Sequence, residues 1–183
     1  NCSTLDKDLF LWNAVIKSYS HGHEARQAFI ILYLMLKNKG LSGQVSPTIV
    51  GLKCLSSLYL HYNSLSGEIP KELSNLQELI DLYLNDNNCL VPFLLILVTW
   101  LLYKLTGNIP TEIGDLKGLS VISLQRNRLD GKILASLENL VMLRRLYLSF
   151  NSLFGEIPTI LANILQLETL DVRKNTLYGN VPS

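Results

Sequence analysis

The sequence predicts an α/β protein, a right-handed solenoid of stacked coils that is preceded by an α-helical hairpin. Parallel strands are expected on the concave side of the solenoid, with short helices or 3-10 turns behind them. Two observations predict the solenoid. Leucines recur at intervals of 24 positions, from Leu55 to Leu79 and again from Leu119 to Leu143 and Leu167. Each repeat also holds a short stretch in which leucines alternate with other residues. A third observation, the helical spacing of apolar residues within 1–39, predicts the hairpin.

The N-terminal segment 1–39 differs from the rest of the chain because it lacks this regular leucine period. Its apolar residues recur at the spacing of a helix face, first around Trp12 and again around Ile31. Gly22 lies between these two stretches, where it would end the first helix. We therefore expect two helices joined by a turn in a first domain over 1–39, and a second domain, the solenoid, over 40–183.

The repeats align without gaps over four stretches of the chain: 55–78, 119–142, 143–166 and 167–183. Within the first stretch, Leu58 and Leu60 alternate with Tyr59 and its neighbours, which is the period of a short strand. The leucines would point to one side of the strand and the other residues to the opposite side. One repeat cannot bury its leucine face alone, so we expect stacked repeats to share one core.

An uncharged run, Cys89–Tyr103, interrupts one repeat. The interval from Leu79 to Leu119 exceeds one period by the length of 89–104, and removal of 89–104 restores the period. A helix that spans a bilayer needs about 20 apolar residues, with roughly 17 as the lower limit, and this run is shorter. Three interpretations of this insertion stay open: a membrane span, an apolar loop or helix that bulges from the solenoid, and an artefact of splicing or of the gene model.

An asparagine occupies the ninth position of each repeat, at the end of the expected strand. Its amide can bond the backbone of the turn that leaves the sheet. Stacking would align these asparagines in a structural ladder made of Asn63, Asn87, Asn127, Asn151 and Asn175. A glycine follows at the thirteenth position, from Gly67 to Gly179, and allows tight backbone there.

The outward-facing strand positions are the candidate binding residues, because they are not needed for the core. Tyr59, Tyr83 and Tyr147 share one column, and tyrosine is a frequent anchor in protein interfaces. Alternatively, these rings only stack on neighbouring strands, which tyrosine suits. The strands toward the C-terminus are more basic, which indicates either an acidic partner or solvated surface charge. The candidate binding residues are Tyr59, His61, Tyr62, Tyr83, Asn85, Gln125, Arg126, Arg145, Tyr147, Phe150, Asp171 and Arg173.

The pattern L-x-x-L-x-L-x-x-N-x-L-x-G-x-I-P resembles the plant-type leucine-rich repeat. The resemblance covers 40–88 and 105–183, and it is to the ectodomains of plant receptor-like kinases and receptor-like proteins. It implies a fragment of a signalling receptor that recognises a peptide or protein ligand without catalysis, together with a co-receptor. It also implies a location at the plasma membrane or outside the cell.

Residues 8–39 resemble one pentatricopeptide repeat, the helical-pair unit of organellar RNA-binding proteins, through W-N-x-V-I-x-x-Y, a turn and Q-A-F-x-x-L-x-x-M. The resemblance implies a base-reading role for Asn13. A single repeat cannot fill that role, since such proteins read one base per repeat over many repeats. Two alternative interpretations of the chain follow: an RNA-associated fragment, and a chimeric gene-model product without a function of its own.

The composition points to no cofactor, metal or nucleic-acid partner. Lys and Arg number 16 and Asp and Glu 15, so the net charge of +1 does not favour a polyanion. Cys2, Cys54 and Cys89 have neither metal-ligand nor disulfide spacing. We find no phosphate loop, hydrolase, metalloprotease or kinase motif, and we expect no enzymatic activity in this chain. We also recognise no signal peptide, so an extracellular location rests on the resemblance alone.

Overall fold

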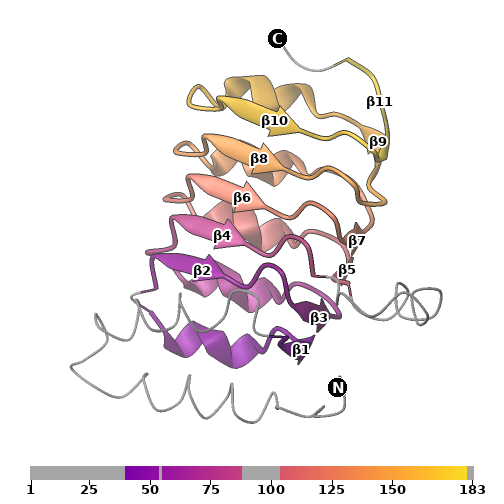
Figure 1. The fold of residues 1–183 in the computed structure, drawn as a ribbon. Coiled ribbons are helices and arrows are strands. Elements are labelled where there is room, and N and C mark those ends of the chain that lie inside the picture. The colour runs from indigo at the N-terminus through magenta and orange to yellow at the C-terminus, as the bar shows by residue number, and fades with distance from the viewer. Residues whose placement is uncertain (1–39, 54, 88–103, 181–183) are drawn as a thin grey trace, which may run out of the picture.

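The computed structural model describes residues 40–53, 55–87 and 104–180. Figure 1 shows these residues as a stack of coils, with strands on one face and 3-10 helices behind them. The predicted solenoid of parallel strands is thereby confirmed. The predicted hairpin in 1–39 and all but the last residue of the predicted insertion 89–104 lie outside the described residues.

The principal sheet is parallel and has five strands in the order β10-β8-β6-β4-β2. Each coil contributes one three-residue strand: β2 Ser57–Tyr59, β4 Asp81–Tyr83, β6 Val121–Ser123, β8 Arg145–Tyr147 and β10 Thr169–Asp171. We call the solvent side of this sheet the sheet face. It corresponds to the side that the sequence predicted to be concave.

The register of the sheet shows that the leucine period continues across the insertion. Leu58 pairs with Leu82, and Ile122 pairs with Leu146, each one period apart. Leu82 pairs with Ile122, which is more than one period away. The excess over one period equals the length of the predicted insertion 89–104. A stretch of that length in this coil therefore adds nothing to the register.

Short lateral strands, which the alternation of leucines did not predict, follow the principal strands. They pair as β1 Ser42–Gln44 with β3 Ser64–Ser66, β5 Thr106–Gly107 with β7 Arg128–Leu129, and β9 Phe154–Glu156 with β11 Thr176–Tyr178. A bridge between Gly67 and Leu105 links the first pair to the second. Each of these segments holds at most one leucine, and none has a second leucine two positions away, so they lack the alternation that predicted the principal strands.

Each coil returns through a five-residue 3-10 helix: η1 Pro47–Gly51, η2 Lys71–Asn75, η4 Thr111–Asp115, η5 Ala135–Asn139 and η6 Thr159–Asn163. Pro70, Pro110 and Pro158 hold the extended backbone at three of the entries, with φ between −63° and −60°. Leu134 takes the same place with φ −87° and ψ 142°, so the fold tolerates its substitution. Among the described residues, no helix has the length and apolar character needed to cross a bilayer.

The core consists of rows of leucine and isoleucine that run through all coils. Leu82, Leu124 and Leu146 are fully buried, and Ile122 is 1% exposed. Burial of such a side chain contributes about 1.5–3 kcal/mol, so these rows are the main force that holds the coils together. Leu170, on the last strand of the sheet, is only partly buried because no further strand pairs with β10.

Candidate ligand-recognition surface

The register places the candidate binding residues in columns across the sheet face. One column contains Tyr59, Tyr83, Ser123, Tyr147 and Asp171 in spatial order. Ser123 therefore separates Tyr147 from the other two tyrosines. The sequence alone had grouped the three tyrosines in one column, but the structure brings only two of them together.

An aromatic cluster covers the sheet face over β2 and β4, and we define it as Tyr59, His61, Tyr62 and Tyr83. The rings of Tyr59 and Tyr83 stack with centroids 4.9 Å apart and an interplanar angle of 16°. The centroid of the His61 ring lies 5.7 Å from that of Tyr83 and 5.1 Å from that of Tyr62. Stacked and edge-on contacts of this kind stabilise ring positions by about 0.5–1.5 kcal/mol per pair. The cluster thus presents a fixed aromatic surface over these two coils.

Asp81 adjoins the aromatic cluster, although we had not selected it as a binding residue. Its Oδ2 atom accepts hydrogen bonds from the hydroxyls of Ser57 and Tyr59 on the neighbouring strand, at 3.2 and 3.3 Å. Burial and the charge of Asp81 raise the pKa of Tyr59, so the phenol stays protonated and keeps donating. A signal for Asp81 was available, since the repeat spacing places it beside Ser57.

Three of the outward strand positions are more buried than their place on the sheet face suggested. His61 is 8% exposed, Asn85 4% and Ser123 1%. Ser123 directs its hydroxyl at the side-chain oxygens of Asn85 and Gln125, at 2.9 and 2.8 Å, and it carries one proton to donate. His61, Asn85 and Ser123 therefore form the floor of the face, whereas Tyr62 is 49% exposed.

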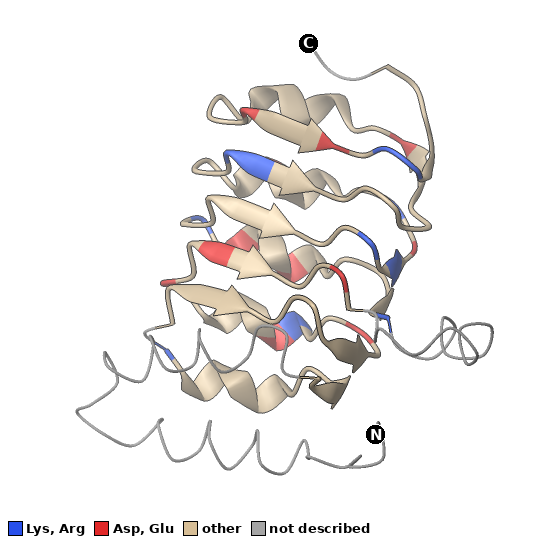
Figure 2. Ribbon diagram, in the orientation of Figure 1, with Lys and Arg blue, Asp and Glu red and all other residues tan. Residues whose placement is uncertain are grey.

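Ion pairs neutralise two of the basic residues on the strands toward the C-terminus, Arg126 and Arg173. Arg126 pairs with Asp86 at 3.6 Å and lies 5.2 Å from the centre of the Phe150 ring. Arg173 donates to both carboxylate oxygens of Asp171, at 2.8 and 3.0 Å, which lowers the pKa of Asp171 to about 2. Figure 2 shows an acidic residue on β4, a basic residue on β8 and an acidic residue on β10, so charges of both signs are distributed along the sheet.

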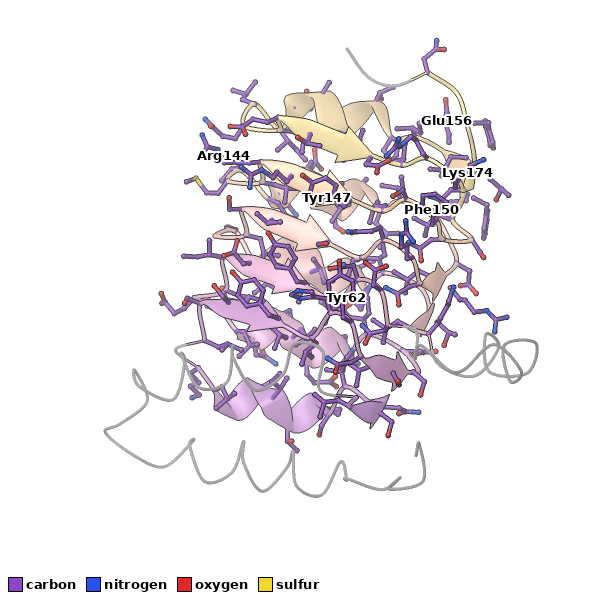
Figure 3. All side chains as sticks on the ribbon, in the orientation of Figure 1. Tyr62, Arg144, Tyr147, Phe150, Glu156 and Lys174 are labelled. Carbon is purple, nitrogen blue, oxygen red and sulfur yellow. The ribbon has the colours of Figure 1, made fainter. Side chains whose placement is uncertain are left out.

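A residue with left-handed backbone lies three positions after the end of each strand of the principal sheet. These residues have φ between 53° and 58°, and they are Tyr62, Asp86, Arg126, Phe150 and Lys174. The backbone N–H of Tyr62 donates to the carbonyl of Asn85 in the next coil, and that of Phe150 donates to Arg173. Such bonds hold an arrangement that costs a non-glycine residue about 1–2 kcal/mol. The side chains therefore project beyond the strand ends, as Figure 3 shows for Tyr62, Phe150 and Lys174.

The five ladder asparagines bond backbone groups of two coils rather than of one. Each Oδ1 accepts from the backbone N–H of the residue 22 positions earlier, at 3.0–3.4 Å. Each Nδ2 donates to the carbonyl three positions earlier in its own coil, at 2.7–3.1 Å. The sequence analysis had foreseen bonds to the local turn, whereas the bonds to the preceding coil emerge only from the stacking.

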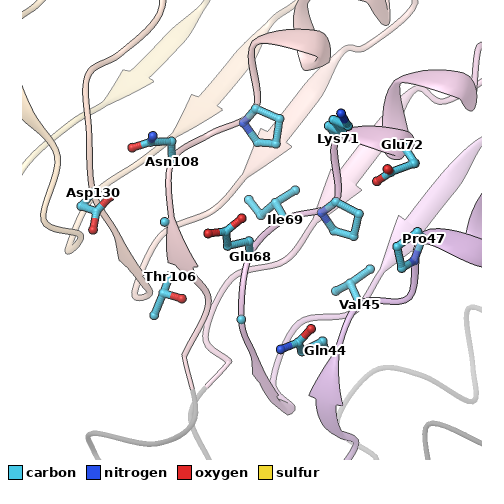
Figure 4. Close-up of a pocket in the computed structure, with 14 residues that line it drawn as sticks. Gln44, Val45, Pro47, Glu68, Ile69, Lys71, Glu72, Thr106, Asn108 and Asp130 are labelled. Atoms are coloured by element: carbon cyan, nitrogen blue, oxygen red, sulfur yellow. The ribbon is translucent and has the colours of Figure 1, made fainter.

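A lateral hollow of about 970 Å³ lies away from the sheet face, beside the lateral strands (Figure 4). Its polar lining includes Glu68, Lys71, Glu72 and Asp130. No residue of this hollow was among the sequence candidates. Within the described ranges, no three His, Cys, Asp or Glu side chains are close enough together to hold a metal ion.

Comparison with known proteins decides the family. A model described as Leucine Rich Repeat matches residues 54–76 and 142–164. The solved BIR3–SERK2 complex of Arabidopsis thaliana contains a chain that is 34% identical, with a TM-score of 0.65, over 81% of this chain and 70% of that one. The chain belongs to the leucine-rich-repeat family. The resemblance to plant receptor ectodomains is confirmed by these matches.

Two further relatives of this leucine-rich-repeat chain differ in how much of it they match. The Arabidopsis receptor kinase HAESA, solved with the peptide hormone IDA and the co-receptor SERK1, is 37% identical, with a TM-score of 0.68. That match covers 80% of this chain but 22% of the receptor chain, so the chain spans about a fifth of that receptor. A chloroplast pentatricopeptide repeat-containing protein of Arabidopsis thaliana is 66% identical over 32 residues, which are 18% of this chain and 5% of the relative.

Proposed function

We propose that this chain is a non-catalytic recognition module of a plant receptor-like protein or receptor-like kinase, and that it binds an extended peptide across the sheet face. The observation that carries the proposal is the aromatic cluster. Four rings from two adjacent coils touch one another on a solvent-facing surface, and Tyr62 remains 49% exposed. Aromatic residues with fixed positions are the usual anchors of protein and peptide interfaces.

The geometry of the face suits an extended ligand. Neighbouring strands of a sheet lie about 4.8 Å apart, so the five strands span roughly 19 Å. An extended peptide advances about 3.3 Å per residue, and about six residues would therefore cross the face. Each coil offers four outward positions along its strand and strand end, so successive ligand residues would meet successive coils.

The receptor relatives support the remaining parts of the proposal. HAESA was solved with a peptide hormone and a co-receptor, and SERK2 was solved in complex with BIR3. We propose by analogy that the longer protein to which these coils correspond acts in signalling at the plasma membrane, with its ligand-binding face outside the cell. A co-receptor would then contact the same solenoid beside the ligand.

Selection from a phage-displayed library of random dodecapeptides tests this function. The full chain serves as bait, and binding of the selected peptides is measured again with Tyr59→Ser and Tyr83→Ser variants, because serine occupies this column at Ser123. We expect selected peptides to lose at least tenfold in affinity. Tyr178→Ser removes a 66% exposed tyrosine from a lateral strand and is the matched control. Failure to select any peptide, or equal binding to all variants, would overturn the proposal.

A second function, RNA binding, is favoured by one observation, the 66% identity over 32 residues to a pentatricopeptide protein. A gel-shift titration of the full chain with a short single-stranded RNA of mixed sequence tests it. Saturable binding that Asn13→Ala weakens would favour this function. Retention of the free RNA band at micromolar protein would reject it.

A further inference from the structure

Asp81 differs from the other two carboxylates of the sheet face in its partners. Asp86 pairs with Arg126 and Asp171 pairs with Arg173, whereas no Lys or Arg among the described residues pairs with Asp81. The hydroxyls of Ser57 and Tyr59 both donate to its Oδ2 atom. A cationic donor can therefore approach Oδ1, the carboxylate oxygen that these two hydroxyls leave open.

The stacked rings of Tyr59 and Tyr83 lie on the same two strands as the bonds to Asp81. They are half-buried, as Asp81 is, so all three can be reached from solvent. Aromatic faces attract cations electrostatically. A carboxylate beside two tyrosines combines this attraction with a charge-assisted hydrogen bond.

The molecule itself shows how a guanidinium fits such a combination. Arg126 pairs with the carboxylate of Asp86 from the preceding coil, and it also lies over the ring of Phe150 from the following coil. Asp81 with Tyr59 and Tyr83 has the same two components, a carboxylate and aromatic rings from adjacent coils. Only the arginine is missing, because Val121 occupies the position that pairs with Asp81 on β6.

We infer that Asp81, Tyr59 and Tyr83 form a subsite for an arginine side chain of the ligand. This inference rests on the proposed function, since it names one residue of the peptide that the sheet face would bind. A planar guanidinium can stack on a tyrosine ring and donate to a carboxylate at the same time, which an ammonium group does less well. The carboxylate on β4 would in this way fix the position and direction of the peptide.

Titration of the full chain with the acetylated, amidated tripeptide Gly-Arg-Gly tests the subsite directly. Backbone amide NMR signals report binding, and Gly-citrulline-Gly is the neutral control of the same shape. We expect saturable shifts confined to β2 and β4 with the arginine peptide, weakening as salt is raised, and no saturation with the citrulline peptide. Equal binding of both peptides would overturn the subsite.

Two variants complete the test. Asp81→Asn retains an oxygen that can accept from Ser57 and Tyr59, and we expect it to weaken arginine-peptide binding at least tenfold. Asp130→Asn removes the same charge from an exposed position in the lateral hollow and should leave binding within twofold. Comparable loss in both variants would contradict a local site and indicate a general charge effect.

The peptide library separates failure of the subsite from failure of the proposed function. Arginine-rich peptides that bind the wild type and not Asp81→Asn would support both. Selected peptides that need the aromatic cluster but contain no arginine would retain the proposed function and reject the subsite. Saturation by the arginine tripeptide without any selected peptide would retain the subsite and reject recognition of an extended peptide.

Discussion

The side-chain amide of Asn127 donates a 2.9 Å hydrogen bond to the carbonyl oxygen of Leu84, 43 positions earlier. The equivalent bonds from Asn151 to Leu124 and from Asn175 to Leu148 each span 27 positions. The difference between these two spans equals the length of 89–104. The asparagine ladder and the sheet register therefore agree that a stretch of this length in one coil lies outside the repeating structure.

Deletion of residues 89–104 should leave the solenoid folded. The change joins Asn88 to Leu105 and restores a coil of regular length, so the pairing of Leu82 with Ile122 needs no adjustment. A shorter connection between Asn88 and Leu105 loses less chain entropy on folding, and we expect the free energy of unfolding to rise by up to about 2 kcal/mol. Urea denaturation measures this change. Loss of cooperative unfolding would mean that 89–104 take part in the core.

Substitution of Asn127 by alanine should destabilise the protein by about 1–3 kcal/mol. It leaves the buried N–H of Leu105 without its acceptor, and an unsatisfied buried group costs about that much. The carbonyls of Leu84 and Leu124 lose one donor but still accept from Asn87 and Asn151. Denaturation in urea gives the value. Asn139→Ala, an exposed change in η5, is the control and should alter stability by less than about 0.5 kcal/mol.

Gly131→Ala should cost more than Gly40→Ala, although both glycines have positive φ, +83° and +68°. A Cβ atom on Gly131 would overlap the side chain of Asn108 from the preceding coil, whereas one on Gly40 meets nothing within 4 Å. Backbone strain alone accounts for about 1–2 kcal/mol at each site. The overlap should add about 1–3 kcal/mol at Gly131.

A double-mutant cycle isolates the overlap. Asn108→Ala shortens the opposing side chain, so the pair Asn108→Ala with Gly131→Ala should recover most of the added cost while leaving the strain. Thermal unfolding of the four proteins provides the interaction energy. Additive effects of the two substitutions would show that Asn108 moves aside freely.

The Asp171–Arg173 pair should make a small, pH-dependent contribution to stability. Hydrogen bonds from Arg173 lower the pKa of Asp171 from 3.8 to about 2, so the contribution is complete above about pH 4 and is lost as pH falls toward 2. Solvent screens this pair, so we expect its contribution to the free energy of unfolding to be small. NMR titration of the Asp171 carboxyl carbon in Arg173→Gln should give a pKa close to 3.8. An unchanged pKa would assign the shift to another cause.

The periodic features of the fold could be predicted because equivalent positions of successive repeats have the same environment in each coil. Spacing alone placed three residues in one buried row: Leu82, Ile122 and Leu146. Spacing alone also predicted the length of the insertion between Leu82 and Ile122. Spacing determines which face a residue occupies. It carries no information on how far neighbouring side chains lean over that residue.

For this reason the sheet face was predicted less well than the core. His61 and Asn85 face the predicted side but are almost completely buried. Arg126 and Arg173 face solvent as predicted, yet acidic partners take up their charge, and such pairs depend on side-chain rotamers that periodicity does not specify. The bonding of Asp81 was missed because its partners Ser57 and Tyr59 lie in another coil.

The glycine column also limits how the solenoid can change in length. The polar side chain that follows each column glycine lies against the glycine one coil further on, as Gln44 does at Gly67 and Glu68 at Gly107. A whole coil can therefore be duplicated or lost without disturbing this interlock, because each unit supplies one side chain and one vacant space. Extra residues leave this interlock intact where they enter between the interlocking contacts, as they do between Asn87 and Leu105.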